Sequence, residues 1–134
     1  MSAKTIVKTF YDSNLATDEN LIDMFHQDCI LYWNSSQGFT ILNKDKIAEM
    51  LKGIRASYLS FTYRLSHLLE DGNTITARYT IYHTTIERPL KEEPLAHFIS
   101  IWEIKDGKIF RGYEISQKLD DSEENLTSFS EIKI

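Results

Sequence analysis

The sequence predicts a single α+β domain in which helices come first and a largely antiparallel sheet follows. Before residue 57, apolar residues recur at three- and four-residue spacings, which is typical of helices with one buried face. From Ser57 onward the period changes to two, as in half-buried strands. The triplets Glu70-Asp-Gly72 and Lys105-Asp-Gly107 separate long alternating segments and predict two hairpins.

Three helices are predicted, two before the first strand and one between it and the later strands, each with a side chain that can cap its N-terminus. Ser2 caps the first helix, Thr17 caps a short second helix that ends near His26, and Asn43 caps the third. The apolar stripes of the first and third helices consist of Ile6, Val7, Phe10, Tyr11 and Leu15, and of Ile47, Met50, Leu51 and Ile54.

Five strands are predicted, the first of which is the β-branched and aromatic segment Cys29–Trp33, closed by a turn at residues 34–38. The other four cover about residues 60–69, 74–87, 95–104 and 108–118. Three-residue loops at the two Asp-Gly pairs would place Tyr63 opposite Tyr79, Trp102 opposite Phe110 and Phe98 opposite Glu114. Glu114 is then the single acid on an otherwise apolar inward face.

The predicted domain covers residues 1–118, and residues 119–134 form an acidic tail. The connection from Ile86 to Pro94 carries both prolines and five charged residues, which indicates a solvated flap. The tail either stays irregular or docks as a short element through its apolar residues Leu126, Phe129, Ile132 and Ile134.

Composition argues against several classes of partner. The 134 residues carry a formal net charge of -5, whereas nucleic acids and anionic membranes require a cationic face. The longest apolar run is far short of the roughly 20 residues that cross a bilayer, and the N-terminal residues lack a signal core, so we expect a cytoplasmic protein. Cys29 is the single cysteine, and no ligand-spaced His or Cys set, phosphate-binding loop or nucleophile elbow is present. We therefore expect neither a metal nor a cofactor.

Three segments, in this order and spacing, resemble the nuclear transport factor 2-like superfamily. They are residues 21–33 (LIDMFHQDCILYW), 43–47 (NKDKI) and 102–114 (WEIKDGKIFRGYE), and they are most similar to the SnoaL-like and ketosteroid-isomerase-like branches. The resemblance implies a cone-shaped, cystatin-like fold in which a curved mixed or antiparallel sheet packs on three N-terminal helices. It also implies a pocket inside the cone and a homodimer through the convex face of the sheet.

The resemblance carries over to the site only in part. The isomerases use a carboxylate base on the first strand, where this chain has Trp33 or Asn34, and neither can abstract a carbon-bound proton. The limonene-epoxide-hydrolase-like enzymes use a Tyr and an Asn two residues apart and an acid on the last strand, which Tyr32, Asn34 and Glu114 match. The Arg and Asp of that site have no counterpart, because Thr80, Ile81 and Tyr82 occupy the corresponding strand.

Alternation along the second long strand places His83 on the same inward side as Tyr79. We predict that His83 and Glu114 form an acid/base pair assisted by the hydroxyl of Tyr32, because imidazole exchanges protons near neutral pH. In the alternative, His83 is structural and bonds a Ser or Thr on an adjacent strand, while Glu114 bonds Tyr32, Asn34 or a helix N-terminus.

The predicted pocket is lined by aromatic side chains with one polar anchor: Asn34, Tyr63, Tyr79, Phe98, Trp102 and Phe110. Such walls suit a small apolar or cyclic, polyketide-like molecule. The sequence predicts a protein with a pocket for a small molecule. If the protein is an enzyme, we expect it to catalyse a cofactor-free isomerisation or hydrolysis. The alternative is a non-catalytic, dimeric module that binds a ligand or associates with a protein. In the association module, the interior would be filled by the protein's own side chains.

The opposite face of the sheet is also apolar, with Ile99, Ile101, Ile109, Tyr113 and Ile115. Contiguous apolar surface of this kind marks an interface, so we predict a twofold homodimer. The alternative is that the acidic tail covers the same surface.

Overall fold

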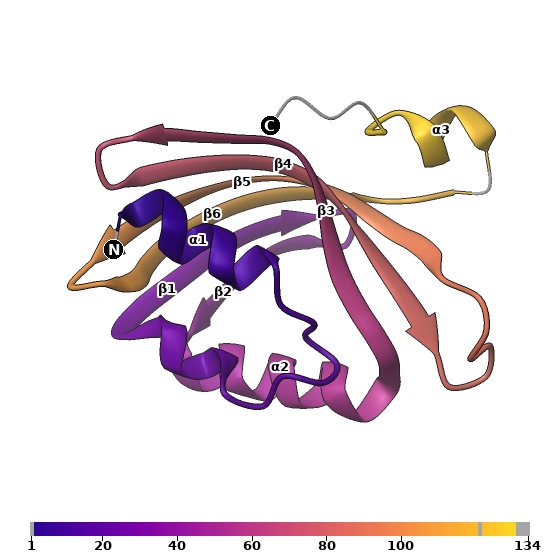
Figure 1. Cartoon of the computed structure of the whole chain (residues 1–134), viewed down its shortest axis with the longest axis horizontal. Helices are drawn as coiled ribbons and strands as arrows, with labels where there is room; N and C mark the ends of the chain where they lie inside the picture. The colour runs from indigo at the N-terminus through magenta and orange to yellow at the C-terminus, as the bar shows by residue number, and fades with distance from the viewer. Residues whose placement is uncertain (1, 121, 131–134) are drawn as a thin grey trace.

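The computed structural model describes residues 2–120 and 122–130 of the chain. Its elements follow one another in this order: α1 (Ala3–Tyr11), η1 (Leu21–Met24), β1 (Phe25–Ser35), β2 (Gly38–Asn43), α2 (Lys44–Ser57), β3 (Tyr58–Asp71), β4 (Thr74–Thr85), β5 (Glu93–Lys105), β6 (Lys108–Lys118) and α3 (Glu123–Thr127). The six strands form one sheet in the order β2-β1-β6-β5-β4-β3 (Figure 1). Only the β1–β6 pair among these neighbours is parallel. The predicted α+β fold with a mixed sheet is confirmed.

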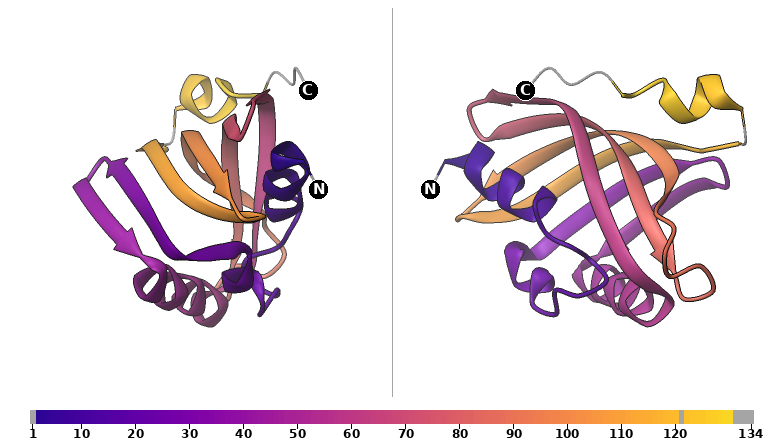
Figure 2. Two further views of the ribbon diagram at one scale, coloured as in Figure 1. Left: turned by 90° about the vertical axis from the view of Figure 1, so that its left-hand side faces the viewer. Right: turned by 45° about the vertical axis from the view of Figure 1, so that its right-hand side comes forward.

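The sheet is curved, and α1, η1 and α2 lie together on its concave side, whereas α3 lies over the opposite side (Figure 2). The buried core sits between the three N-terminal helices and the sheet. None of the helices in the described part of the chain combines the length and apolar character that a membrane crossing requires.

Two of the predicted helix caps are present. The Ser2 hydroxyl accepts a hydrogen bond from the backbone N–H of Thr5 at 3.1 Å, and Asn43 Oδ1 accepts from the N–H of Lys46 at 3.0 Å. Each bond satisfies one of the N–H groups that a helix start leaves without a backbone partner.

The second predicted helix is only the short 3₁₀ helix η1, and Thr17 does not cap it. Thr17 lies instead in a loop organised by Asn14, whose backbone N–H donates to Asp18 and whose side-chain Oδ1 accepts from the N–H of Phe61. These bonds fix the loop against β3, so the chain turns before a helix can start. His26, expected at a helix end, lies in β1.

Strand β2 is an element that the sequence did not predict. It pairs with β1 at the edge of the sheet, and the predicted turn at residues 34–38 shrinks to Ser36 and Gln37 between the two strands. Phe39 and Ile41 are 58% and 50% exposed. An edge strand with exposed apolar residues lacks the inward and outward alternation that reveals a strand in the sequence.

Both hairpins have two-residue loops rather than the predicted three. The closing pairs are Asp71 with Thr74 and Lys105 with Lys108. Gly72, Asp106 and Gly107 have φ angles of 59°, 53° and 74°, in the left-handed region that tight hairpin loops use.

A bulge in each hairpin then changes the register again. An extra residue at Ser66 of β3 places Tyr63 opposite Ile81 instead of Tyr79. An extra residue at Phe110 of β6 places Gly112 opposite Trp102. Glu114 consequently lies opposite Ser100 rather than the predicted Phe98.

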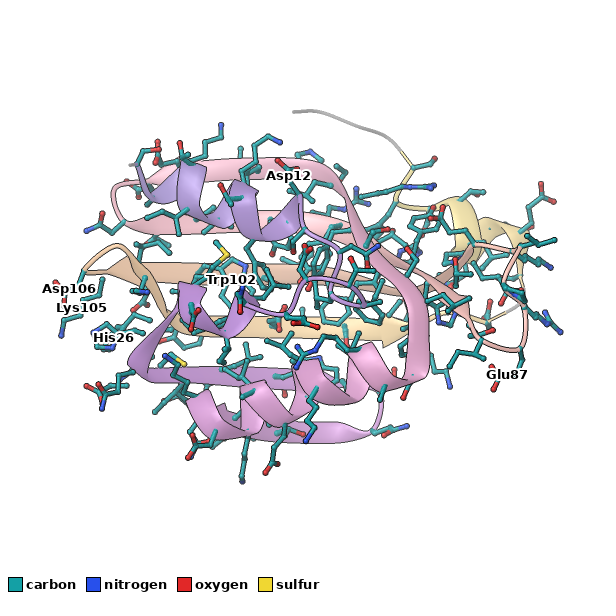
Figure 3. All side chains as sticks on the ribbon, turned by 60° about the horizontal axis from the view of Figure 1, so that its bottom comes forward. Asp12, His26, Glu87, Trp102, Lys105 and Asp106 are labelled. Atoms are coloured by element: carbon teal, nitrogen blue, oxygen red, sulfur yellow. The ribbon has the colours of Figure 1, made fainter. Side chains whose placement is uncertain are left out.

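The connection between β4 and β5 lies at one end of the sheet, where Figure 3 shows Glu87, and the turn with Lys105 and Asp106 lies at the other end. Leu90 in this connection is fully exposed, and Arg88 pairs with Glu93 at 3.0 Å. Residues 86–92 are therefore the solvated flap, although β5 already begins at Glu93.

The acidic tail docks in part. After β6 ends at Lys118, α3 follows, and the Phe129 ring stacks on His97 with centroids 4.2 Å apart. His97 is buried on the outer face, where Thr80 Oγ1 lies 2.8 Å from its Nδ1 and the carbonyl oxygen of Asn125 lies 2.6 Å from its Nε2. Ile132 and Ile134 lie outside the described residues.

Gly112 is the tightest glycine position. A Cβ atom there would lie 2.5 Å from Trp102 and 2.8 Å from Leu31, whereas one at Gly53 in α2 meets nothing within 4 Å. We expect Gly112→Ala to lower the free energy of unfolding by about 1–3 kcal/mol, because the packed sheet must shift. Gly53→Ala, the matched control, should raise it by about 0.5–1 kcal/mol. Urea denaturation measures both, and equal effects would contradict this account.

Candidate functional site

A cavity of about 360 Å³ opens on the concave side of the sheet. Its walls come from β1, α2 and the four long strands β3 to β6, and most of its surface is apolar. The apolar and aromatic wall residues include Trp33, Ile54, Phe61, Ile81 and Phe98. This volume falls within the range of pockets that bind small organic molecules. The interior is therefore not filled by its own side chains, as one alternative from the sequence required.

The other end of the concave side is packed by aromatic rings. Phe10 of α1 contacts Phe25 and Trp102 at ring-centroid distances of 5.5 and 6.2 Å. The indole Nε1 of Trp102 donates to the Tyr11 hydroxyl at 2.6 Å. Trp102, predicted as a pocket residue, therefore belongs to the closed core beneath the helices (Figure 3).

Glu114 of β6 supplies the acidic group of the cavity. The hydroxyls of Tyr79 and Ser100 both donate to its Oε2, at 2.7 and 2.6 Å. The two hydroxyl oxygens also lie 2.8 Å from each other. Among the described residues, Oε1 has no hydrogen-bond partner, so it is the oxygen left available to a molecule in the cavity.

Burial raises the pKa of Glu114 above its ordinary value of 4.5, and the hydrogen bonds from Ser100 and Tyr79 offset part of that rise. The cause is the apolar surroundings, which disfavour the charged carboxylate. A carboxyl group with a raised pKa is a stronger base when ionised and holds its proton to higher pH.

Tyr63 of β3 presents a second polar group to the cavity. Its ring packs edge-on against Tyr11 and Tyr79, with centroids 4.9 and 5.3 Å apart. Burial, followed by the charges of Glu114 and Tyr11, raises the pKa of Tyr63 well above its ordinary value. Its hydroxyl therefore keeps its proton and can act as a hydrogen-bond donor.

The polar groups at the mouth come from two elements. Ser35, Ser36 and Gln37 at the β1–β2 turn and Lys118 at the end of β6 line the opening. The backbone N–H of Lys118 donates to the Ser36 hydroxyl at 3.3 Å, which joins the turn to the end of β6.

Four of the predicted site residues border the cavity: Tyr63, Tyr79, Phe98 and Glu114. Phe110, predicted to line it, does not. Phe110 is the third residue of β6, close to the β5–β6 turn, and its ring contacts His26 at a centroid distance of 4.9 Å and lies under Arg111.

Tyr32 and Asn34 are on the outer face of β1, which corrects their predicted role beside Glu114. The Tyr32 ring stacks on Tyr113 with centroids 5.3 Å apart, and Asn34 is exposed. Trp33 points inward instead, and its Nε1 donates to the Ser116 hydroxyl at 3.0 Å.

The predicted pair of His83 and Glu114 does not form. Glu114 lies beside Tyr79, and His83 is four residues farther along β4, or about 13 Å. His83 instead packs against Tyr58 at a ring-centroid distance of 5.2 Å, and its buried Nδ1 has no partner among the described residues. Burial lowers the pKa of His83, against the opposing effect of Glu93. The bond to a neighbouring threonine that the structural alternative expected of His83 is made by His97.

Ser100 and Lys118 were not predicted as residues of the site. Ser100 is fully buried, and it is a small polar residue between the inward-facing Phe98 and Trp102. That interruption of an apolar face was a usable signal for a partner of a buried acid. Lys118 continues the two-residue alternation from Glu114 and could have been found in the same way.

Within the described ranges, no three His, Cys, Asp or Glu side chains gather closely enough to hold a metal ion.

The family model for the SnoaL-like domain matches residues 7–112 of this chain. Among solved structures, IdmH, a candidate polyketide cyclase from Streptomyces antibioticus, has a TM-score of 0.69 at 11% identity and covers 97% of this chain and 99% of its own. An LEH-like epoxide hydrolase from M. tuberculosis has a TM-score of 0.67 at 14% identity, with coverages of 94% and 86%. A phenazine biosynthesis-related protein from Pseudomonas aeruginosa has a TM-score of 0.67 at 17% identity, with coverages of 97% and 81%. Comparison with curated protein sequences gives no significant match.

Glu114 should make stability depend on pH. Because its pKa is raised in the folded state, the folded chain binds the proton more tightly, and ionising Glu114 costs folding free energy as pH rises above its ordinary value of 4.5. Glu114→Gln avoids this cost and keeps an oxygen that accepts from Tyr79 and Ser100. We expect the stability of the variant relative to wild type to increase from about pH 4 to about pH 8, by about 1.4 kcal/mol for each unit of pKa difference.

Urea denaturation at both pH values measures this change. The matched control is Glu49→Gln, which replaces an exposed carboxylate on α2 and should show little change between the two conditions. A Glu114→Gln effect that is the same at both pH values would contradict the burial of an ionisable carboxyl.

Proposed function

The chain belongs to the SnoaL-like domain family, and we propose that it binds a small apolar, ring-containing molecule and catalyses a cofactor-free proton transfer on it. The observation that carries this proposal is a carboxyl group with a raised pKa in an apolar cavity, with one oxygen held and the other free. Two similar structures are a candidate polyketide cyclase and an LEH-like epoxide hydrolase, and the formation of one ring and the opening of another support ring chemistry as the class of reaction.

In the proposed reaction, Glu114 acts as the base and then as the acid. Its carboxylate Oε1 takes a proton from a carbon that lies between a carbonyl group and a C=C double bond, and the C–H electron pair moves onto the carbonyl oxygen to give a dienolate. The same proton then returns to the far carbon of the former double bond, so the double bond shifts into conjugation with the carbonyl and the isomerisation is complete. Tyr79 and Ser100 hold Oε2, so the reacting oxygen keeps one orientation. Tyr63 donates a hydrogen bond to the carbonyl oxygen, where negative charge develops.

Hydrogen exchange on a carbon acid tests this chemistry without knowledge of the natural substrate. The exchange of the α-protons of 2-tetralone in D₂O, followed by proton NMR, should be accelerated by the wild-type protein. Glu114→Gln should lose at least about a hundredfold of this acceleration, because a general base contributes about 10²–10⁴ in rate. His83→Ala is the matched control and should change little, because His83 lies outside the cavity wall.

A thermal-shift measurement with the same ketone separates binding from catalysis, since a ligand of the folded state raises the melting temperature. Stabilisation without accelerated exchange would contradict the catalytic proposal and favour the ligand-binding module. Neither stabilisation nor exchange would contradict both.

We also propose that two chains associate through the outer face of the sheet. Ile99, Ile101, Tyr113 and Ile115 are 43%, 40%, 41% and 61% exposed on that face. The described part of the tail, residues 122–130, covers the surface around His97, and the four residues above remain exposed. A contiguous apolar surface of this kind favours a second copy of the same surface across a twofold axis.

Sedimentation at micromolar concentration tests the dimer. Wild type should sediment at twice the chain mass, and Ile101→Asp should shift the population to monomer because it buries an unpaired charge in the interface. Leu90→Asp is the control, since Leu90 is fully exposed in the flap. A wild-type mass equal to one chain would exclude this association.

A further inference from the structure

One strand carries a regular series of polar side chains into the cavity. Glu114, Ser116 and Lys118 of β6 are two residues apart, and all three line the cavity. Because successive side chains on a strand point to opposite faces, this spacing places the three on one inward line. The surrounding wall is mainly apolar, and these three residues add a carboxyl, a hydroxyl and an ammonium group to it.

The two ends of this line differ in charge and in exposure. Glu114 is only partly exposed, and the hydroxyls of Ser100 on β5 and Tyr79 on β4 both donate to its Oε2. Lys118 is the last residue of β6 and is exposed at the opening. Four residues of extended strand separate them by about 13 Å. Ser116 between them already accepts a hydrogen bond from Trp33.

The ammonium group of Lys118 is available to a ligand. None of the ion pairs within the described residues involves it. The neighbouring acid Asp120 accepts hydrogen bonds from both the backbone N–H and the hydroxyl of Ser122, at 2.9 and 2.7 Å. Ser36 and Gln37 lie at the same rim and add neutral hydrogen-bonding groups.

We infer that the cavity selects ring compounds that carry a carboxylate, held at the mouth by Lys118 with the ring body inside. This inference rests on the proposed function, and it specifies the substrate class and its direction of entry. A carboxylate at the opposite end would meet the acidic Glu114 in an apolar environment, where two like charges repel. At the mouth the same group gains a charge-assisted hydrogen bond and keeps part of its hydration.

A pair of probes that differ only in charge tests the inference by calorimetric titration. Naphthalene-2-carboxylate should bind wild type about tenfold more tightly than naphthalene-2-carboxamide, as a hydrogen bond to a charged group provides. Lys118→Met should remove this preference, so that the carboxylate binds no more tightly than the amide. Lys46→Met, at an exposed position on α2, should keep the preference. The preference should also shrink at high salt.

The results distinguish this inference from the function on which it rests. Equal binding of the two probes to wild type, or a preference that survives Lys118→Met, would overturn the carboxylate assignment and leave the apolar pocket in place. Ala96→Phe narrows the cavity, because Ala96 is a small residue in its wall. If neither probe binds, or if both bind this variant as they bind wild type, the proposed pocket function fails together with the inference.

Discussion

The two hydrogen bonds that converge on Oε2 of Glu114 are the interaction on which the site depends. A carboxyl group in apolar surroundings is costly unless it is hydrogen-bonded, and the two donors here come from two other strands, Ser100 from the adjacent β5 and Tyr79 from β4 beyond it. Three strands must therefore keep one register. The bulge at Phe110 sets that register, since it brings Glu114 opposite Ser100. The acidic centre of the cavity thus follows from a one-residue irregularity in the sheet.

Alternation in the sequence predicted most of the fold and part of the site, because the sheet buries one face of each long strand. Tyr63, Tyr79, Phe98 and Glu114 were all assigned to the concave side, and all border the cavity. Bulges are not visible in a single sequence, since an extra residue changes pairing without changing composition. The predicted partners across each hairpin were wrong because each loop is one residue shorter than predicted and each hairpin also contains a bulge, although the parity of these four residues was right.

The errors at Tyr32 and His83 have different physical causes. Both faces of β1 carry large rings, so apolar character cannot show that Trp33 points inward and Tyr32 outward. For His83 the sheet face was assigned correctly with Ile81, but a shared face does not mean a shared cavity. Ile81 is the last residue of β4 that lines the cavity. His83, two residues farther along the strand, packs against Tyr58. The extent of a cavity depends on how side chains from several elements fill the space between them. The sequence of a single strand therefore cannot show where the cavity ends.

The boundary between the packed and the hollow part of the cone lies between two consecutive inward positions of β6. Gly112 has no side chain, and its place is taken by Trp102 and Leu31, so the aromatic core closes there without a void. From Glu114 onward, the inward residues of β6 are an acid, a serine and a lysine, which leave space and offer polar groups. A larger residue at position 112 would displace the indole, whereas a larger apolar residue at position 114 or 116 would fill the hollow. Packing at one end of the cone and chemistry at the other are therefore determined by neighbouring positions of the same strand.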